Sequence, residues 1–184
     1  MSPATVAVAQ LIRGISPLDA IELHHIDTAL TWLAGTDDIF RRISRPATPA
    51  QHLVSYVVVV DPDERALLLG SHVKSGLWLP MGGHVEPGEH PLEAAVREAS
   101  EEIGIEAEFT VVGAAPLFLT ITTTVGDNSH CDVSLWYVVR GHRAHTYHLD
   151  PAEFSKAQWW DLDSRALPES DPHLGRFLTK LTAA

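Results

Sequence analysis

The chain has 184 residues, of which 45% are hydrophobic, and it carries a net charge of −11 at pH 7. This length and composition fit one domain with a sizeable core and leave room for one appended subdomain. The negative charge argues against a protein that binds duplex nucleic acid, because such a protein needs a basic face to neutralise phosphates. A small anionic substrate stays compatible, since a bound metal ion reverses the sign of the local field.

Cysteine content and hydropathy bear on where the protein works. The single cysteine, Cys131, excludes an internal disulfide and is typical of a reducing compartment. The first residues contain only a short apolar run, with no basic segment and no cleavage site of the secretory type. No stretch approaches the roughly 20 apolar residues of a membrane-spanning helix. We therefore expect a cytoplasmic protein that makes no membrane contact.

Residues 1–45 are predicted to be helical. A first helix is expected at 3–13, and a second from an N-cap at Ser16, with proline in its first turn, to a stop at Gly35. The proline-containing residues 45–49 resemble a short stiff linker. We expect residues 1–45 to form a helical extension of a main domain at 50–184.

Strands and helices follow in mixed order in the main domain. A turn is expected at 61–64 and another, polar one at 126–129. Strands are expected at 53–60, 66–70, 108–119, 133–140 and 158–161, and a closing helix at 172–181. Such mixed order indicates an α/β or α+β fold.

The most acidic segment, residues 83–105, reads GHVEPGEHPLEAAVREASEEIGI. A helix is expected over 91–103, because proline suits a first helical turn and Gly104 suits a C-terminal cap. Three acids at spacing i, i+3, i+4 would share one face of this helix, namely Glu98, Glu101 and Glu102. Their mutual repulsion would be relieved by a hard divalent cation such as Mg²⁺ or Mn²⁺, which takes oxygen ligands. The face therefore indicates a metal-assisted phosphate enzyme, and an ordinary solvated acidic face is the alternative.

The frame around these acids has a fixed length. It runs Gly83, five residues, Glu89, seven residues, and then REASEEIGI at 97–105. This frame resembles the Nudix box, G-x5-E-x7-R-E-U-x-E-E-x-G-U, in which U is a bulky apolar residue. Every charged and glycine position matches, and the one departure is Ala99 at the first U position. On this resemblance the chain is similar to Nudix hydrolases, which implies a mixed sheet sandwiched between helices.

The resemblance also implies roles for residues of the box. The expected metal ligands are the carbonyl of Gly82 and the three helix acids, of which Glu98 and Glu101 are also assigned as catalytic residues; the full set is Gly82, Glu98, Glu101 and Glu102. Arg97 is expected to pair with Glu89 and to hold the loop against the helix, and it is also a candidate for substrate binding.

The general base is expected either in the box or in a late loop, where Glu153 stands. The alternative for Glu153 is an ordinary acid after a turn. His72 and Lys74 are the other candidates for substrate binding, and Lys74 could contact a phosphate as a mobile point charge.

The eleven histidines show no HExxH motif and no Cys/His zinc spacing, so the sequence predicts no structural zinc site. His130 and Asp132 form a His-x-Asp pair that could bind a metal or sugar hydroxyls. Ordinary hydrogen bonding between loop residues is the favoured alternative for this pair.

The expected function is that of a Mg²⁺- or Mn²⁺-dependent pyrophosphohydrolase. It would cleave a phosphoanhydride bond of a nucleoside diphosphate linked to another moiety, nucleoside triphosphates included. A nucleotide-sugar or ADP-ribose hydrolase with the same box stays open, as does a non-catalytic Nudix-fold ligand sensor or regulator. The expected partner is a small nucleotide or other diphosphate. The helical extension could form a homodimer, dock another protein, or cover the core as a lid.

Overall fold

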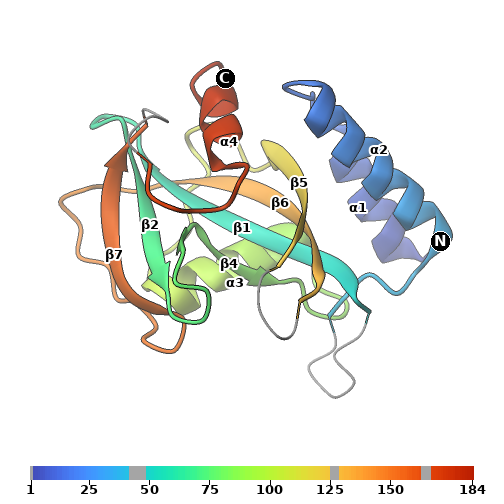
Figure 1. Ribbon diagram of the computed structural model, residues 1–184, viewed down its shortest axis with the longest axis horizontal. Coiled ribbons are helices and arrows are strands. Elements are labelled where there is room, and N and C mark those ends of the chain that lie inside the picture. Colours follow the sequence, from blue (N-terminus) through green and yellow to red (C-terminus); the bar gives the residue numbers. More distant parts are fainter. Residues whose placement is uncertain (1, 42–48, 125–128, 163–166) are drawn as a thin grey trace.

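The computed structural model describes residues 2–41, 49–124, 129–162 and 167–184 (Figure 1). Four helices and seven strands are present in these ranges: α1 (Pro3–Arg13), α2 (Ala20–Gly35), β1 (Gln51–Asp61), β2 (Ala66–His72), β3 (Trp78–Leu79), β4 (Met81–His84), α3 (Pro91–Ile103), β5 (Phe118–Thr123), β6 (Cys131–Arg140), β7 (Phe154–Asp161) and α4 (Leu174–Leu181). No helix in the described ranges is long and apolar enough to cross a membrane.

The described strands form one mixed sheet. Its order is β3-β2-β1-β6-β5, with β4 added beside β1 and β7 beside β2. β1 runs parallel to β6, whereas the remaining pairs are antiparallel. β4 pairs with residues 54–57 of β1, and β2 pairs with residues 59–61 of the same strand. The acidic segment therefore starts from the middle of the sheet, because β4 leads directly into the loop before α3.

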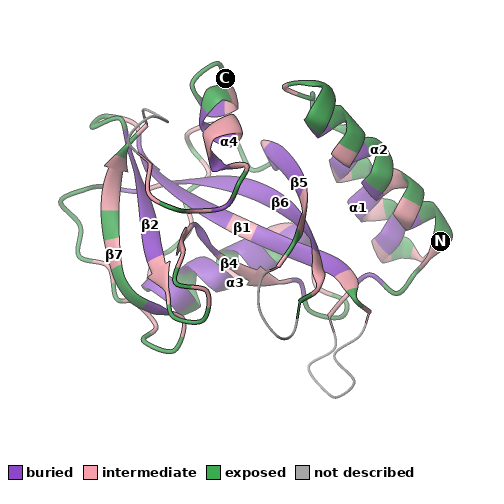
Figure 2. Cartoon of the chain, in the orientation of Figure 1, coloured by how far each residue is buried: buried purple, intermediate pink, exposed green. Residues whose placement is uncertain are grey.

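The two faces of the sheet bury two hydrophobic clusters. Alternate residues of β1 face opposite ways: Leu53 and Val57 lie in a cluster with α3, while Val58 and Val60 lie in a cluster with α4. Figure 2 shows the buried strands at the centre and exposed surface on the outer helices. The sheet is thus sandwiched between helices in an α+β fold, as predicted from the sequence.

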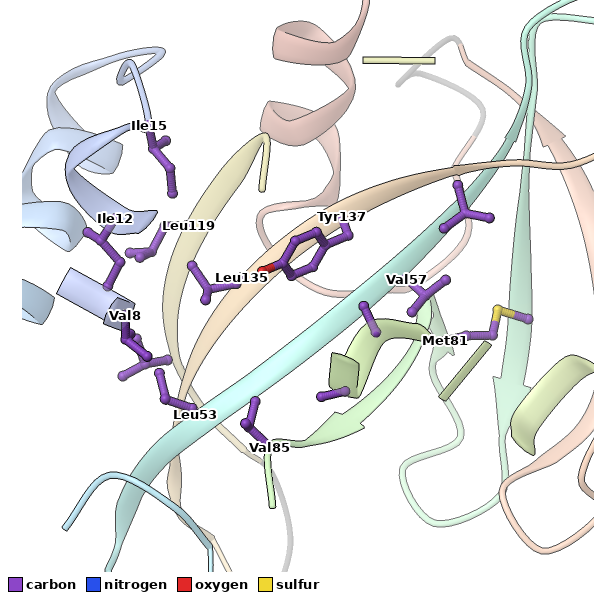
Figure 3. Close-up of a cluster of buried hydrophobic side chains, with 14 of the residues drawn as sticks. Val8, Ile12, Ile15, Leu53, Val57, Met81, Val85, Leu119, Leu135 and Tyr137 are labelled. Atoms are coloured by element: carbon purple, nitrogen blue, oxygen red, sulfur yellow. The ribbon is translucent and has the colours of Figure 1, made fainter. Parts of the chain in front are cut away.

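The N-terminal helices share a core with the sheet. Val8 and Ile12 of α1 belong to the same buried cluster as Leu119 of β5 and Leu135 of β6 (Figure 3). This shared core attaches α1 and α2 to the side of the sheet that also carries α3. The expected division into 1–45 and 50–184 stays a prediction, and most of the expected linker at 45–49 lies outside the described residues, as does most of the polar turn at 126–129.

The predicted start of the second helix is wrong. The helix begins at Ala20 rather than just after Ser16, because Asp19 supplies the cap. One oxygen of Asp19, Oδ1, accepts the N–H groups of Ile21 and Glu22, each at 2.9 Å. Aspartate in this position satisfies donors that the first helical turn leaves unpaired.

The strand predicted at 108–119 is also wrong for most of its length. Regular pairing starts only at Phe118, where β5 begins. Pro116 has no N–H to donate to a ladder, and Gly113 adopts a φ of +94°, so the chain turns before it can pair. The two-residue β3 and the four-residue β4 were not predicted, since strands this short show no alternation of hydrophobicity. The other predicted helices and strands are confirmed to within a few residues of their bounds.

Candidate active site

The acidic helix α3 spans the predicted residues and is fixed at both ends. At its start, the ring Nδ1 of His90 accepts the N–H of Leu92 at 3.2 Å, and the Glu93 carboxylate accepts the N–H of His90 at 3.1 Å. At its end, Gly104 takes a left-handed φ of 70° and donates its N–H to the last turn. Ser55 of β1 donates its hydroxyl to the Pro91 carbonyl at 2.7 Å, which attaches the helix start to the sheet. These bonds fix which face of α3 is turned toward the sheet.

Two of the three predicted metal-binding glutamates are buried at the contact between α3 and β4. Glu98 and Glu102 are 8% and 6% exposed, whereas the side chain of Glu101 is 59% exposed. The Glu98 carboxylate lies so close to Gly83 that a Cβ on Gly83 would stand 2.4 Å from its Oε1. The N–H of Gly82 donates to Oε2 of Glu102 at 2.6 Å. Gly83 therefore admits the Glu98 carboxylate to the strand backbone, in a place that a side chain would fill.

Arg97 joins the loop to the acidic face. Its Nε and Nη2 donate to the two oxygens of Glu89 at 2.9 and 3.0 Å, so the predicted Arg97–Glu89 pair is present. Its Nη1 donates to Glu98 at 2.7 Å and to Glu101 at 3.1 Å. Glu98 and Glu101 each use one oxygen in these bonds. A role of Arg97 in substrate binding stays a prediction, because its contacts here are made within the protein.

The buried carboxylates have perturbed acidity. Burial raises the pKa of Glu98, and it raises the pKa of Glu102 to about 8. The neighbouring negative charges of Glu98 and Glu153 act in the same direction on Glu102, while the hydrogen bond from Gly82 opposes them. Among the described residues, no basic side chain forms a salt bridge with Glu102. Desolvated carboxylates of this kind are suited to a hard divalent cation, so the residues present fit the predicted Mg²⁺ or Mn²⁺.

Three other predicted site residues meet in a second cluster. The Glu153 carboxylate accepts two bonds from Lys74 Nζ, at 2.7 and 3.0 Å, and its Oε2 lies 3.4 Å from Nε2 of His72. The N–H of Val73 donates to the Glu153 carbonyl at 2.8 Å, which fixes the late loop beside the end of β2. Since the charge of Glu153 acts on Glu102, this cluster lies within electrostatic range of the acidic helix.

A third group was missed at the level of sequence. His52, His84, His130 and Asp132 each place a potential ligand atom within 4.8 Å of the others. Only the pair at 130 and 132 is visible in the sequence, because the other two histidines are brought in by strand pairing. No spacing rule could have found this group without the register of the sheet.

Comparison with known proteins identifies the family. The family model described as NUDIX domain matches residues 50–181. The chain belongs to the Nudix family. This confirms the resemblance carried by the box and by the mixed sheet.

Similar proteins include several hydrolases. An RNA pyrophosphohydrolase of Gluconacetobacter diazotrophicus is 32% identical over 111 residues, which cover 54% of this chain and 65% of that protein. The asymmetrical bis(5'-nucleosyl)-tetraphosphatase of Rattus norvegicus is 57% identical over 35 residues, which cover 19% of this chain and 24% of that protein. The matched part of the chain thus spans about a quarter of the length of the rat relative.

Solved structures share the fold. A MutT NUDIX hydrolase from Burkholderia pseudomallei aligns with a TM-score of 0.52 and 22% identity, covering 71% of this chain and 97% of that one. A C. elegans Ap4A hydrolase binary complex aligns with a TM-score of 0.51 and 20% identity, covering 71% and 95%. At these identities the likeness concerns the fold alone.

Proposed function

We propose that this Nudix protein is a divalent-metal-dependent pyrophosphohydrolase. It cleaves a phosphoanhydride bond in a nucleoside diphosphate that is linked to another moiety. The observation that carries the proposal is the pair of buried carboxylates, Glu98 and Glu102, held against Gly82 and Gly83. Burial of two carboxylates at one contact is costly, and only Glu98 has a basic partner, Arg97, among the described residues.

The proposed metal ligands are the Gly82 carbonyl and the carboxylates of Glu98, Glu101 and Glu102. A bound Mg²⁺ or Mn²⁺ would neutralise the substrate diphosphate and lower the pKa of a bound water. Arg97 restrains Glu98 and Glu101 through hydrogen bonds, so their oxygens are oriented before substrate arrives. The chain's own contribution is therefore the fixed geometry of the oxygen donors.

Glu153 is the proposed acceptor of the proton from the attacking water. In the structure both of its oxygens are engaged by Lys74, whose side chain is 68% exposed on a flexible stem. We expect Lys74 to move from Glu153 to a substrate phosphate, which frees the carboxylate when substrate is bound. His72 remains beside Glu153 and completes the substrate-binding group.

The names of the relatives support a choice of substrate class. Their names describe enzymes that act on bis(5'-nucleosyl) tetraphosphates and on RNA pyrophosphate bonds. Both describe a phosphoanhydride next to a nucleotide. We therefore propose dinucleoside polyphosphates, nucleoside triphosphates and RNA 5'-polyphosphates as the first candidates, with nucleotide sugars and ADP-ribose as the comparison set.

The test is a substrate panel with the full chain in Mg²⁺ or Mn²⁺, scored for phosphate and nucleotide products. Turnover of at least one candidate is expected, and a chelator should abolish it. Glu101→Gln and Glu102→Gln should lose turnover, whereas Glu106→Gln, which removes an exposed acid just beyond the helix, should keep it. Binding of nucleotides without turnover across the whole panel would instead favour a Nudix-fold sensor.

A further inference from the structure

The strand register explains why four potential metal ligands lie on one face of the sheet, namely His52, His84, His130 and Asp132. His52 of β1 is directly opposite Asp132 of the parallel strand β6. His84 of β4 is opposite Val54, two residues along β1 from His52 and therefore on the same face. His130 stands two residues before Asp132, at the start of β6. Three adjacent strands thus direct their imidazole and carboxylate groups to one place.

The tautomer of His52 leaves its Nε2 and the Asp132 carboxylate in contact without a proton between them. Its Nδ1 lies 2.9 Å from the Pro49 carbonyl, which can only accept, so Nδ1 carries the proton and donates. In a neutral ring, Nε2 then presents a lone pair, and it faces Oδ1 of Asp132 at 3.4 Å. Two acceptors therefore face each other in a side chain that is 2% exposed. Neither His52 Nε2 nor Asp132 Oδ1 has a hydrogen-bond partner among the described residues.

A cation between the two atoms would satisfy both. Buried unpaired acceptors are costly, and metal-binding histidines commonly donate their other N–H to a backbone carbonyl, as His52 does. A second proton on His52 would also satisfy the contact, but it would place a charge on a side chain that is almost fully buried.

Two of the ligand–ligand distances suit a tetrahedral ion, and the four candidate ligand atoms together lie within 4.8 Å of one another. Zn²⁺ bonds of about 2.0–2.1 Å to nitrogen and oxygen imply ligand–ligand edges of about 3.3 Å. Oδ1 of Asp132 lies 3.4 Å from Nε2 of His52 and 3.2 Å from Nε2 of His130. Three imidazoles and one carboxylate are a donor set for Zn²⁺, unlike the all-oxygen set of the acidic helix.

We propose that His52, His84, His130 and Asp132 form a zinc site, separate from the acidic helix, that ties β1, β4 and β6 together. Arg41 competes for one corner of it, since its Nη1 lies 2.9 and 3.0 Å from the two ring nitrogens of His84. Zinc binding displaces the guanidinium from that ring. The proposal is independent of the hydrolase activity, because it concerns different side chains and is read out by binding.

The test is titration of the chelator-treated full chain with Zn²⁺ by calorimetry, with Mg²⁺ in excess to fill the acidic helix. One Zn²⁺ should bind per chain, raise the midpoint of thermal unfolding, and allow replacement by Co²⁺ with the visible absorption of a tetrahedral ion. Asp132→Asn, which keeps the shape of the side chain, and His52→Gln should each weaken binding by at least about tenfold. Arg41→Gln should tighten binding, and His142→Gln, an exposed histidine outside the group, should leave it unchanged.

The opposite pattern would overturn the proposal. Equal zinc affinity in wild type and Asp132→Asn would rule out the proposed site. Loss of zinc binding only in Glu98→Gln or Glu102→Gln would also rule it out, because the ion would then bind at the acidic helix. Circular dichroism of the metal-free variants separates loss of ligands from loss of fold. If His52→Gln does not fold, the Asp132→Asn result decides alone.

Discussion

Two buried glutamates, Glu22 of α2 and Glu102 of α3, differ in whether a basic side chain is paired with them. Glu22 of α2 is fully buried and accepts a bond from Lys180 Nζ of α4 at 2.7 Å. It also accepts the N–H of Leu18 at 2.6 Å and the N–H of Leu119 at 3.3 Å. Its charge is thus neutralised by the protein itself, and the pair connects the N-terminal helices to the C-terminal helix and to β5.

Glu102 of α3 is almost as deeply buried but has a different environment. It accepts one hydrogen bond, from Gly82, and it is surrounded by other carboxylates, among them Glu98 and Glu153. Its pKa is raised to about 8, chiefly by burial. A buried carboxylate without a basic partner is costly to ionise, and such perturbed groups are frequent at functional sites. The contrast shows that Glu22 is paired within the fold, whereas Glu102 has no basic partner among the described residues, which fits its proposed role as a metal ligand.

The largest effect on turnover is expected from Glu102→Gln. We expect turnover to fall by about 1000-fold, because a metal ligand is lost from a step in which the ion stabilises the transition state. The free energy of unfolding should stay the same or rise, since the amide oxygen can still accept the N–H of Gly82 and the side chain can no longer ionise in a buried position. Steady-state kinetics and urea unfolding of the same preparation measure both. A strongly destabilised variant with full turnover per folded molecule would reverse the assignment.

Glu22→Gln should show the opposite behaviour. Removing the charge leaves Lys180 buried without its partner, which should cost about 3 kcal/mol of unfolding free energy. Turnover per folded molecule should be unchanged, because Glu22 does not belong to the acidic face. Adding Lys180→Met in a double variant should restore part of the stability, as a double-mutant cycle would reveal. Additive losses in the cycle would show that the two side chains do not act as a pair.

Glu153→Gln tests a third carboxylate, which forms a salt bridge with Lys74. We expect turnover to fall by about 100-fold through loss of the general base, with a smaller effect on stability. Lys74→Gln should raise KM more than it lowers kcat, because Lys74 is assigned to phosphate binding. Steady-state kinetics of both variants measure these changes. Unchanged turnover in Glu153→Gln would leave the base within the box.

The box was predictable from sequence because its chemistry is local. The carboxylates at 98, 101 and 102, the proline at the helix start and Gly104 at the helix end all lie within about four turns of one element, and the helix has the predicted bounds. Its apolar side was readable in part: Ala95, Ala99 and Ile103 are buried at helical spacing, whereas Val96, which the same apolar pattern predicts to face the core, is 42% exposed.

What sequence could not supply depends on pairing between distant strands. The proposed zinc site requires His52 opposite Asp132, with His84 beside both. This arrangement follows only from the register of β1 with β4 and β6. The contact of Lys74 with Glu153 likewise requires the pairing of β2 with β7. The salt bridge of Glu22 with Lys180 joins residues 158 positions apart. Tertiary packing decides such contacts, and neither hydrophobic periodicity nor turn chemistry records them.

A further prediction concerns the pH dependence of stability, to which Glu102 should contribute strongly and which should be reduced without it. Its pKa rises from 4.5 to about 8 on folding. Between these values the folded state holds a proton that the unfolded state has released, so the unfolding free energy must fall as pH rises through the window. In chelator, wild type should lose unfolding free energy progressively as the pH rises across this window.

Glu102→Gln should flatten this slope, and Glu106→Gln should keep it, when urea unfolding is measured at intervals from pH 5 to 8. Mg²⁺ should stabilise wild type most at the upper end of the range, because the ion binds the ionised carboxylate and stabilises only the folded state. A slope that persists in Glu102→Gln would assign the proton to another group. In that case Glu102 and Glu22 would differ in their partners but not in their state of charge, and the distinction between the two helices would depend on the turnover measurements alone.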